Sequence, residues 1–374
     1  MGELYLGVMS GTSQDGVDAA IVEFDAAGSQ IHHATTTPYP EELRARIAKL
    51  LTEPQTSLQE LGNLDVAVGR FFAQCVVKLV ETSSFGVSDI VAIGHSGHTV
   101  FHNPEAPDAF TMQIGDPSTI AAETGITTVG DARKMDVALG GQGAPLAPAF
   151  HEWCFSDTTE SRIALNIGGI ANISVLHPNR PLLGFDTGPG NTLLDNWSQR
   201  CISKPFDRHG EWSRKGSVVE PLLQALKTDT YFRRSPPKST GIEHFNLGWL
   251  DLGLRQLAEA PATEDVQATL TQLTAETIAD AIISTDAKPQ RVILCGGGAL
   301  NTALIERLSD LLPQAQLESS ATHGISPEWV EAALFAWLAR ARLEGEPGNV
   351  PTVTGARQAA PLGGVYFGTG EHCN

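Results

Sequence analysis

The feature that most constrains this chain is a strand, glycine turn and strand pattern that occurs twice. Leu4–Phe24 reads as an apolar strand, the turn GTSQDG and a second strand, and Arg162–Leu176 repeats this arrangement around Gly168 and Gly169. Glycine, serine and aspartate between apolar runs are turn signals. A hairpin that opens each half of the chain predicts two similar lobes around a cleft. One large α/β domain with two unrelated hairpins is the alternative.

Helical and strand-like segments alternate along the rest of the chain, which is typical of the α/β class. Apolar periodicity predicts helices over Glu41–Leu51, Leu58–Thr82 and Glu328–Leu343, the last of them strongly amphipathic. Short apolar runs predict further strands at 31–37, 89–94, 109–115, 126–131 and 291–295. We place the first lobe at 1–130 and the second at 131–344, with 345–374 packing back on the first.

Charge and composition argue against several classes of protein. The 374 residues carry a formal net charge of −18, whereas nucleic-acid-binding domains need a basic patch. No apolar run reaches the roughly 18 residues that a membrane span needs, and the N-terminus lacks the pattern of a secretory leader. The five cysteines are scattered and form no CxxC pair. We expect a cytoplasmic protein with a small-molecule partner and neither a nucleic-acid nor a membrane partner.

Three glycine-rich turns are candidate phosphate loops. In Ser10–Gly16, hydroxyls and backbone N–H groups can form an anion nest, and Asp15 or Asp18 can orient a magnesium ion through water. The turn at 166–172 holds the equivalent place in the second half, and the turn at 295–301 joins a strand to a helix whose N-terminus favours anions. Ordinary polar hairpin and strand-to-helix turns are the alternatives.

Asp186 is the candidate general base. It follows a strand-like run and precedes a Gly-Pro-Gly loop, which places a carboxylate at the end of a strand. The alternative is that Asp186 caps the helix that begins near Asn191. Arg133, upstream of the loop at 140–145, can hold a carboxylate or hydroxyls, with a surface salt bridge as its alternative.

Several familiar signatures are missing from the chain. It contains no GxxxxGK[ST], HExxH or GxGxxG motif. The segment 94–98 resembles a GxSxG nucleophile elbow but ends in His98, which disfavours a serine hydrolase. The spacing of His95, His98 and His102 does not match a standard set of metal ligands.

Motifs over nearly the whole chain resemble the bacterial anhydro-N-acetylmuramic acid kinase family. They occur in the family's order and include MSGTSQDGVD (9–18), DARKMD (131–136), GGQGAPLAPAFH (140–151), LNIGGIANIS (165–174), GFDTGPGN (184–191), KSTG (238–241) and CGGGALN (295–301). At 94–99 the chain reads GHSGHT where the family usually reads GSHGQT.

The resemblance implies two ribonuclease-H-like lobes of the actin and hexokinase superfamily, with ATP and Mg²⁺ in the cleft. It implies that water opens the 1,6-anhydro ring of 1,6-anhydro-N-acetylmuramic acid while the freed O6 attacks the γ-phosphate. The product, N-acetylmuramic acid 6-phosphate, belongs to peptidoglycan recycling. The family also suggests a homodimer.

The resemblance further implies site residues. Asp186 becomes the base that activates water, and His98, Thr99, Arg133 and Glu331 line or hold the sugar. Together with the turns described above, the candidate nucleotide-binding residues are Gly11, Thr12, Ser13, Gln14, Asp15, Gly16, Val17, Asp18, Asn166, Gly168, Gly169, Gly296, Gly297 and Gly298. The magnesium ligand stays unassigned, because Ser10 stands where the superfamily has an aspartate at the end of its first strand.

Two other functions stay open. The chain also resembles levoglucosan kinase, whose anhydrosugar lacks the lactyl and N-acetyl groups; Arg133 disfavours this reading, since a lactyl carboxylate calls for a cation. A non-catalytic actin-like protein that binds sugar or nucleotide is the second alternative. The intact Asp186 and the glycine-rich loops disfavour it.

Overall fold

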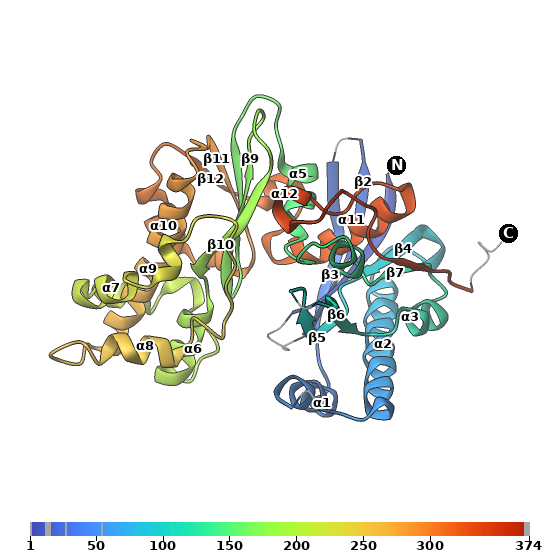
Figure 1. Cartoon of the computed structure of the whole chain (residues 1–374), viewed down its shortest axis with the longest axis horizontal. Coiled ribbons are helices and arrows are strands. Elements are labelled where there is room, and N and C mark those ends of the chain that lie inside the picture. The colour runs from blue at the N-terminus through green and yellow to red at the C-terminus, as the bar shows by residue number, and fades with distance from the viewer. Residues whose placement is uncertain (1, 12–15, 27, 54, 106, 370–374) are drawn as a thin grey trace. The chain divides into compact units, whose positions relative to one another are not determined.

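The computed structural model describes residues 2–11, 16–26, 28–53, 55–105 and 107–369, and the chain divides into two compact units (Figure 1). Unit 1 comprises Met1–Phe150 and His323–Asn374, and unit 2 comprises His151–Thr322. These divisions differ from the predicted lobe boundaries at 130 and 344. Residues 131–150 and 323–344 group with unit 1 rather than with the second lobe.

Unit 1 is built on a sheet of six strands in the order β13-β7-β4-β1-β2-β3. Its strands are β1 (Glu3–Ser10), β2 (Gly16–Asp25), β3 (Gly28–Pro38), β4 (Ile90–His95), β7 (Thr128–Gly130) and β13 (Gly364–Tyr366). The first three form an antiparallel meander, β4 runs parallel to β1, and β7 runs parallel to β4. The antiparallel strand β13 extends the sheet beyond β7, so the last part of the chain completes a sheet that the first part begins.

Helices flank this sheet. They are α1 (Glu41–Thr52), α2 (Leu58–Glu81), α3 (Pro117–Thr124), α4 (Lys134–Ala138), α11 (Val330–Glu344) and α12 (Pro351–Thr354). Three of them, α1, α2 and α11, match the predicted segments. Helix α5 (Ala147–Phe155) crosses the division between the units, and β5 (His98–Asn103) pairs with β6 (Phe110–Ile114) in a separate hairpin.

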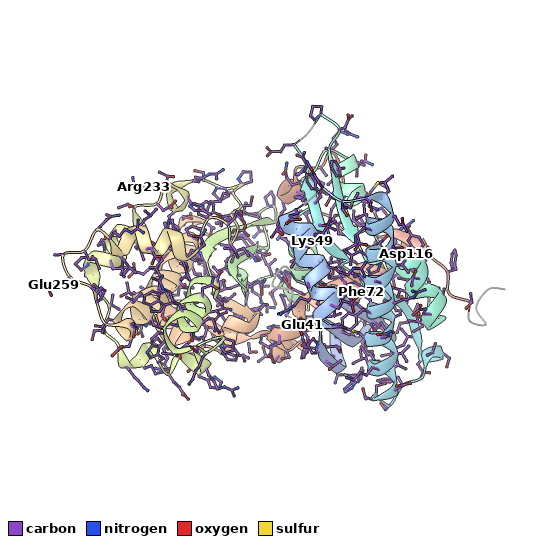
Figure 2. The ribbon with its side chains drawn as sticks, turned by 90° about the horizontal axis from the view of Figure 1, so that it is seen from below. Glu41, Lys49, Phe72, Asp116, Arg233 and Glu259 are labelled. Atoms are coloured by element: carbon purple, nitrogen blue, oxygen red, sulfur yellow. The ribbon has the colours of Figure 1, made fainter. Side chains whose placement is uncertain are left out.

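The long helix α2 shows why the sequence pattern predicts helices well. The Ser57 side chain accepts a hydrogen bond from the Glu60 N–H, which caps the helix at its predicted start. Phe72, labelled in Figure 2, lies with Val68 and Leu79 on the face that α2 buries in the core of unit 1. The periodic apolar residues that predict the helix therefore form the face that packs on the sheet.

Helix α11 explains why residues 323–344 belong to unit 1. It packs against β1 and β4, and only glycine fits beneath it on both strands. A Cβ on Gly7 would lie 1.8 Å from the carbonyl oxygen of Ala332, and one on Gly94 would lie 1.9 Å from that of Phe335. The predicted amphipathic character is wrong, because α11 is buried around most of its circumference. A helix enclosed in this way shows no polar stripe.

Unit 2 is built on a sheet of five strands in the order β10-β9-β8-β11-β12. The strands are β8 (Arg162–Ile167), β9 (Ile170–Leu176), β10 (Leu183–Pro189), β11 (Arg291–Cys295) and β12 (Gln316–Ser319). Again three strands form an antiparallel meander and the next two run parallel to the first. The two units therefore repeat one ribonuclease-H-like sheet order, which confirms the repeat predicted from the paired hairpins.

The helices of unit 2 form a second layer and an outlying cluster. They are α6 (Thr192–Ile202), α7 (Glu220–Lys227), α8 (Leu247–Leu254), α9 (Thr263–Ser284) and α10 (Thr302–Leu311). Helix α9 contributes to two hydrophobic cores. Its later half, with Ile278 and Ile282, packs on the sheet, and its earlier half, with Val266 and Leu270, packs among α6, α7 and α8.

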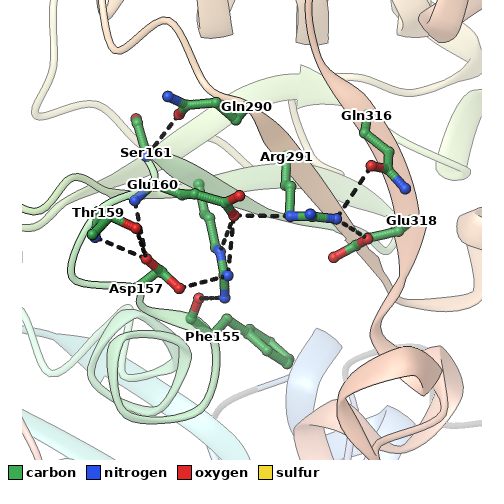
Figure 3. Close-up of polar contacts among 10 residues, drawn as sticks. Phe155, Asp157, Thr159, Glu160, Ser161, Gln290, Arg291, Gln316 and Glu318 are labelled. Atoms are coloured by element: carbon green, nitrogen blue, oxygen red, sulfur yellow. Dashed lines mark hydrogen bonds and ion pairs between the residues drawn. The ribbon is translucent and has the colours of Figure 1, made fainter.

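Ion pairs join the starts of the parallel strands in unit 2 (Figure 3). The Arg291 guanidinium donates to Glu160 on one side and to Glu318 on the other, both at 2.8 Å. Arg162 pairs with Asp157 at 2.8 Å and with the same Glu160 at 3.1 Å. Because a single carboxylate is shared by two arginines, the network fixes the register of β8, β11 and β12 at the edge opposite their carboxyl ends.

The described part of the chain contains no helix with both the length and the apolar character that crossing a membrane requires.

Candidate active site

The carboxyl ends of β8 and β11 bring the glycine-rich turns of unit 2 together. The turn at Gly168 and Gly169 receives backbone hydrogen bonds from the loop after β10: Gly190 N–H donates to the Gly169 carbonyl at 2.9 Å, and Asn191 N–H donates to the Gly168 carbonyl at 2.8 Å. Asn191 also donates from its side chain to the Ile167 carbonyl at 3.1 Å. Two segments separated in sequence thus form one backbone platform.

The third glycine turn closes against the same platform. A Cβ on Gly296 would lie 2.5 Å from the Asn166 Oδ1, and one on Gly298 would lie 2.3 Å from the Ile167 side chain. Gly297 differs from both, because nothing lies within 4 Å of its Cβ position. The turn therefore presents open backbone at Gly297 while its neighbours pack tightly, a surface that a phosphate or nucleotide can approach closely.

Asp186 lies beside this platform as the fourth of the seven residues of β10, not at the end of a strand as predicted, because β10 continues through Gly188 and Pro189. It pairs with Asn172 of β9, and the ladder between the two strands becomes irregular directly after it. Its Oδ2 accepts a hydrogen bond from the Thr240 N–H at 3.0 Å. The N-cap residue of helix α6 is Asn191, and among the described residues no N–H of α6 donates to the Asp186 carboxylate. The structure therefore contradicts the helix-capping alternative.

Burial sets the protonation behaviour of Asp186. It raises the pKa of the carboxyl from 3.8 to about 6, while the Thr240 N–H and the nearby Lys238 ammonium act in the opposite direction. A carboxylate with a pKa near 6 is mostly ionised at neutral pH and basic enough to accept a proton. This is the combination that a general base requires.

The 3-10 helix η4 (Thr230–Arg233) and the segment that follows it hold Asp186 in place, and the sequence analysis assigns neither of them a role at the base. Tyr231 Oη donates to the Asp186 carbonyl at 2.7 Å, and Asp186 N–H donates to the Lys238 carbonyl at 3.3 Å. Arg233, labelled in Figure 2, ends η4 at the start of this loop. In the sequence, the one sign of this role is that residues 233–245 form a long, polar loop. Such a loop indicates a functional surface but does not show that it contacts Asp186.

In unit 1 the end of β1 carries a hydroxyl network. Ser10 Oγ lies 2.8 Å from the Tyr39 hydroxyl and 2.8 Å from His98 Nδ1. The His98 ring is almost fully buried, and burial lowers its pKa to about 4, so the ring is neutral. Its Nε2 has no partner among the described residues. His98 therefore contacts Ser10 within unit 1, and its contact with a sugar stays a prediction.

The first candidate phosphate loop is described only in part. Thr12, Ser13, Gln14 and Asp15 lie outside the described residues, whereas Gly11 precedes that gap and Gly16, Val17 and Asp18 begin β2. Val17 is fully buried in the core, so its side chain serves packing. Asp18 Oδ1 accepts a hydrogen bond from the Thr36 hydroxyl at 2.6 Å.

The predicted sugar-binding residues of unit 1 include one electrostatic pair. Arg133, at the start of α4, donates from Nη1 to the Gly143 carbonyl at 2.9 Å. Burial lowers the pKa of Arg133, and the Glu331 carboxylate at the start of α11 opposes this shift, which places the two charges near each other. Thr99 on β5 accepts a hydrogen bond from Gln113 at 3.2 Å.

Asp136 ties the turn that carries Arg133 to the C-terminal segment of unit 1. Its fully buried carboxylate accepts hydrogen bonds from Gly143 N–H at 2.7 Å, from Asn349 Nδ2 at 2.6 Å and from the Thr354 hydroxyl at 2.7 Å. A Cβ on Gly141 would lie 2.3 Å from the same carboxylate. The glycine-rich loop at 140–145 therefore wraps closely around a buried acid.

Within the described ranges no group of three or more histidine, cysteine, aspartate or glutamate side chains is arranged to hold a metal ion. Asp18 remains the described carboxylate nearest in sequence to the first candidate phosphate loop.

Two ribonuclease-H-like sheets, a glycine turn of unit 2 with open backbone at Gly297 and a carboxylate of raised pKa fit a phosphotransferase of the actin and hexokinase fold class. A family model described as anhydro-N-acetylmuramic acid kinase matches residues 3–368. The chain therefore belongs to the anhydro-N-acetylmuramic acid kinase family and is a sugar kinase.

Relatives and solved structures agree in length with this chain. It is 46% identical over 368 residues to the anhydro-N-acetylmuramic acid kinase of Coxiella burnetii, covering 98% of each chain. It is 47% identical over 363 residues to that of Pasteurella multocida, covering 97% of this chain and 96% of the relative. A solved activator of 2-hydroxyisocaproyl-CoA dehydratase from Clostridium difficile, with bound ADPNP, is 13% identical with a TM-score of 0.42, over 91% of this chain and 96% of that one.

Proposed function

We propose that the chain uses ATP and water to convert 1,6-anhydro-N-acetylmuramic acid to N-acetylmuramic acid 6-phosphate and ADP. The observation that carries the proposal is Asp186, a mostly buried carboxylate of raised pKa beside glycine turns whose backbone is open to a phosphate. The membership of the chain in the anhydro-N-acetylmuramic acid kinase family supplies the class of substrate.

The proposed chemistry joins two bond changes. Asp186 takes a proton from water as the water oxygen forms a bond to the anomeric carbon. The bond from that carbon to O6 breaks, and its electron pair stays on O6, which attacks the γ-phosphorus of ATP as ADP leaves. A glycosidase normally needs a second carboxylic acid to protonate the leaving oxygen. Here phosphorus captures that oxygen, so one carboxylate suffices.

Other residues bind and orient the substrates in this proposal. The Arg133 guanidinium makes one hydrogen bond within the described residues, so its remaining N–H groups are available to a lactyl carboxylate. Glu331 and Thr99 hold sugar hydroxyls, and the turns at 168–169 and 296–298 hold the nucleotide. Magnesium neutralises phosphate charge when bound, and Asp18 is the described residue proposed to hold it through water.

The glycine turn allows a direct test of nucleotide binding. We expect Gly297→Ala to weaken ATP binding about tenfold to hundredfold, because a methyl group in a close contact costs about 1–3 kcal/mol. The melting temperature stays unchanged, since nothing lies within 4 Å of that Cβ position. Gly62→Ala on α2, an exposed glycine with equally open surroundings, is the matched control and keeps full affinity in calorimetry. Equal ATP affinity in both variants would remove Gly297 from the nucleotide site.

A coupled assay of ADP release tests the whole reaction. We expect ADP release that depends on 1,6-anhydro-N-acetylmuramic acid, with little release on levoglucosan, because only the former carries the carboxylate that Arg133 would bind. Mass spectrometry of the sugar product should show both added water and a phosphate. Preference for levoglucosan would favour the alternative anhydrosugar kinase, and absence of ADP with either sugar would favour a non-catalytic binding protein.

A further inference from the structure

Lys238 carries a buried positive charge beside the proposed base. Its side chain is only 9% exposed, and the ammonium lies over two aromatic rings, 4.7 Å from the centre of Tyr231 and 5.7 Å from that of Phe185. Its hydrogen bond within the described residues goes to the Tyr231 carbonyl and is long, at 3.4 Å. Aromatic faces attract a cation but do not replace its hydration, so a buried ammonium needs a negative partner.

The backbone fixes the segment of Lys238 against Asp186. The Asp186 N–H donates to the Lys238 carbonyl at 3.3 Å, and two residues later the Thr240 N–H donates to the Asp186 carboxylate at 3.0 Å. The hydroxyl of Tyr231, whose ring faces the Lys238 ammonium, donates to the Asp186 carbonyl at 2.7 Å. Lysine, tyrosine and aspartate are therefore held as one unit with few degrees of freedom.

The other charges on the elements around Asp186 have partners of their own or act more weakly. On η4 and the turn that follows, Asp229 accepts from His244 at 3.0 Å and from Trp249 at 2.8 Å. On α9, Glu276 and Asp280 both pair with Lys227. The remaining charged groups are Arg233, Arg234 and Glu243 in the segment 229–245, and Glu264 and Asp265 in the first turn of α9. The Arg234 charge lowers the pKa of Lys238 and of Tyr231. The charge that lowers the pKa of Asp186 is that of Lys238.

We propose that Lys238 is a positioning residue whose buried ammonium keeps the Asp186 carboxyl ionised at neutral pH, so that it can take the proton from water. This inference rests on the proposed role of Asp186. The electrostatics agree with the geometry: Lys238 lowers the pKa of Asp186 against the effect of burial, and Asp186 raises that of Lys238 against the same effect. The Thr240 N–H and the Lys238 ammonium, both from one separate loop, thus favour the ionised form of the Asp186 carboxyl.

The test measures the titration of Asp186 directly, in the full-length protein. The carboxyl carbon signal of Asp186 in aspartate-labelled protein is assigned by its loss in Asp186→Asn and followed by NMR as pH changes. We expect Lys238→Met to raise the midpoint by about 1 pH unit, the lower end of the effect of a nearby opposite charge, because the Thr240 N–H still favours the ionised form. Tyr231→Phe, which removes a hydrogen bond to Asp186 but keeps the charge, leaves the midpoint in place. If Lys238→Met does not fold, Lys238→Gln replaces it.

The pH profile of kcat/KM separates this inference from the function it rests on. We expect the acid limb in Lys238→Met to move upward with the NMR midpoint, so that activity recovers at high pH, and Lys238→Arg to restore the original limb. An NMR midpoint that does not move in the variant without the ammonium overturns the role of Lys238. A midpoint that moves while the acid limb stays shows that Lys238 tunes Asp186 as inferred, and that Asp186 is not the base.

Discussion

Asp186→Asn should lower turnover by about 10²–10⁴-fold, the usual contribution of a general base, while ATP binding stays unchanged. The amide keeps the size of the side chain and can still accept a hydrogen bond from the Thr240 N–H, so the loop around it is preserved. What it loses is the ability to take a proton. The nucleotide contacts are placed on other segments, so calorimetry with ATP should give the wild-type affinity.

The pH dependence gives this prediction a second readout. Activity requires the ionised carboxylate, and its pKa is raised to about 6, so wild-type kcat/KM should fall about tenfold per pH unit below pH 6. This acid limb should be missing from the residual activity of Asp186→Asn. The control is Asp251→Asn, the same change at a carboxylate that pairs with Arg200. This variant should keep the wild-type turnover and the wild-type acid limb. Residual turnover above about a tenth of wild type, far short of the loss of a general base, would move the role to another carboxylate, with Glu331 and Asp131 the next candidates.

Asp136→Ala should produce the largest loss of stability. The change leaves three donors, on Gly143, Asn349 and Thr354, without their acceptor in a fully buried place. Since buried unsatisfied groups cost about 1–3 kcal/mol each, we expect the free energy of unfolding to fall by about 3–5 kcal/mol. The melting temperature, followed by circular dichroism, should fall by about 10 °C.

Two comparisons show whether the buried network causes this loss. Thr354→Val removes one donor and should cost about 1 kcal/mol, a fraction of the effect at Asp136. Because the loop at 140–145 also receives Arg133, the KM for sugar should rise in Asp136→Ala more than the KM for ATP. A melting temperature within about a degree of wild type would mean that the three donors find water instead.

The fold could be predicted from the sequence where one face of an element is apolar. The paired hairpins predict the duplicated sheets, and the apolar period of α2 predicts its bounds to within a residue. The assignment of α11 to its sheet could not be predicted, because the residues that decide it are Gly7 and Gly94, more than 230 positions away. Single glycines that let a helix backbone approach a strand leave no periodic pattern in the sequence. The position of α11 along the chain could therefore be predicted, but the strands against which it packs could not.

The candidate site shows the same division. A candidate residue marked by its local sequence, such as Asp186 before a Gly-Pro-Gly run, could be selected from the pattern alone, although the pattern places it after a strand and the structure places it within β10. Residues whose role depends on a contact with a distant part of the chain could not be found in this way. Nothing in the spacing of Lys238 and Tyr231 indicates that they meet at Asp186, and nothing around DARKMD indicates that Asp136 bonds to Asn349.

The position of α11 has a consequence for how the chain is made. Unit 2 is one uninterrupted stretch, so it can fold while the ribosome is still adding residues. The nascent sheet of unit 1 has to wait, because the helix that covers Gly7 and Gly94 is translated after the whole of unit 2, as are two of the three donors to Asp136, Asn349 and Thr354. During that interval the apolar face of β1 and β4 is uncovered and accessible to chaperones. A chain terminated before His323 should therefore retain a folded centre and become prone to aggregation through its first strands.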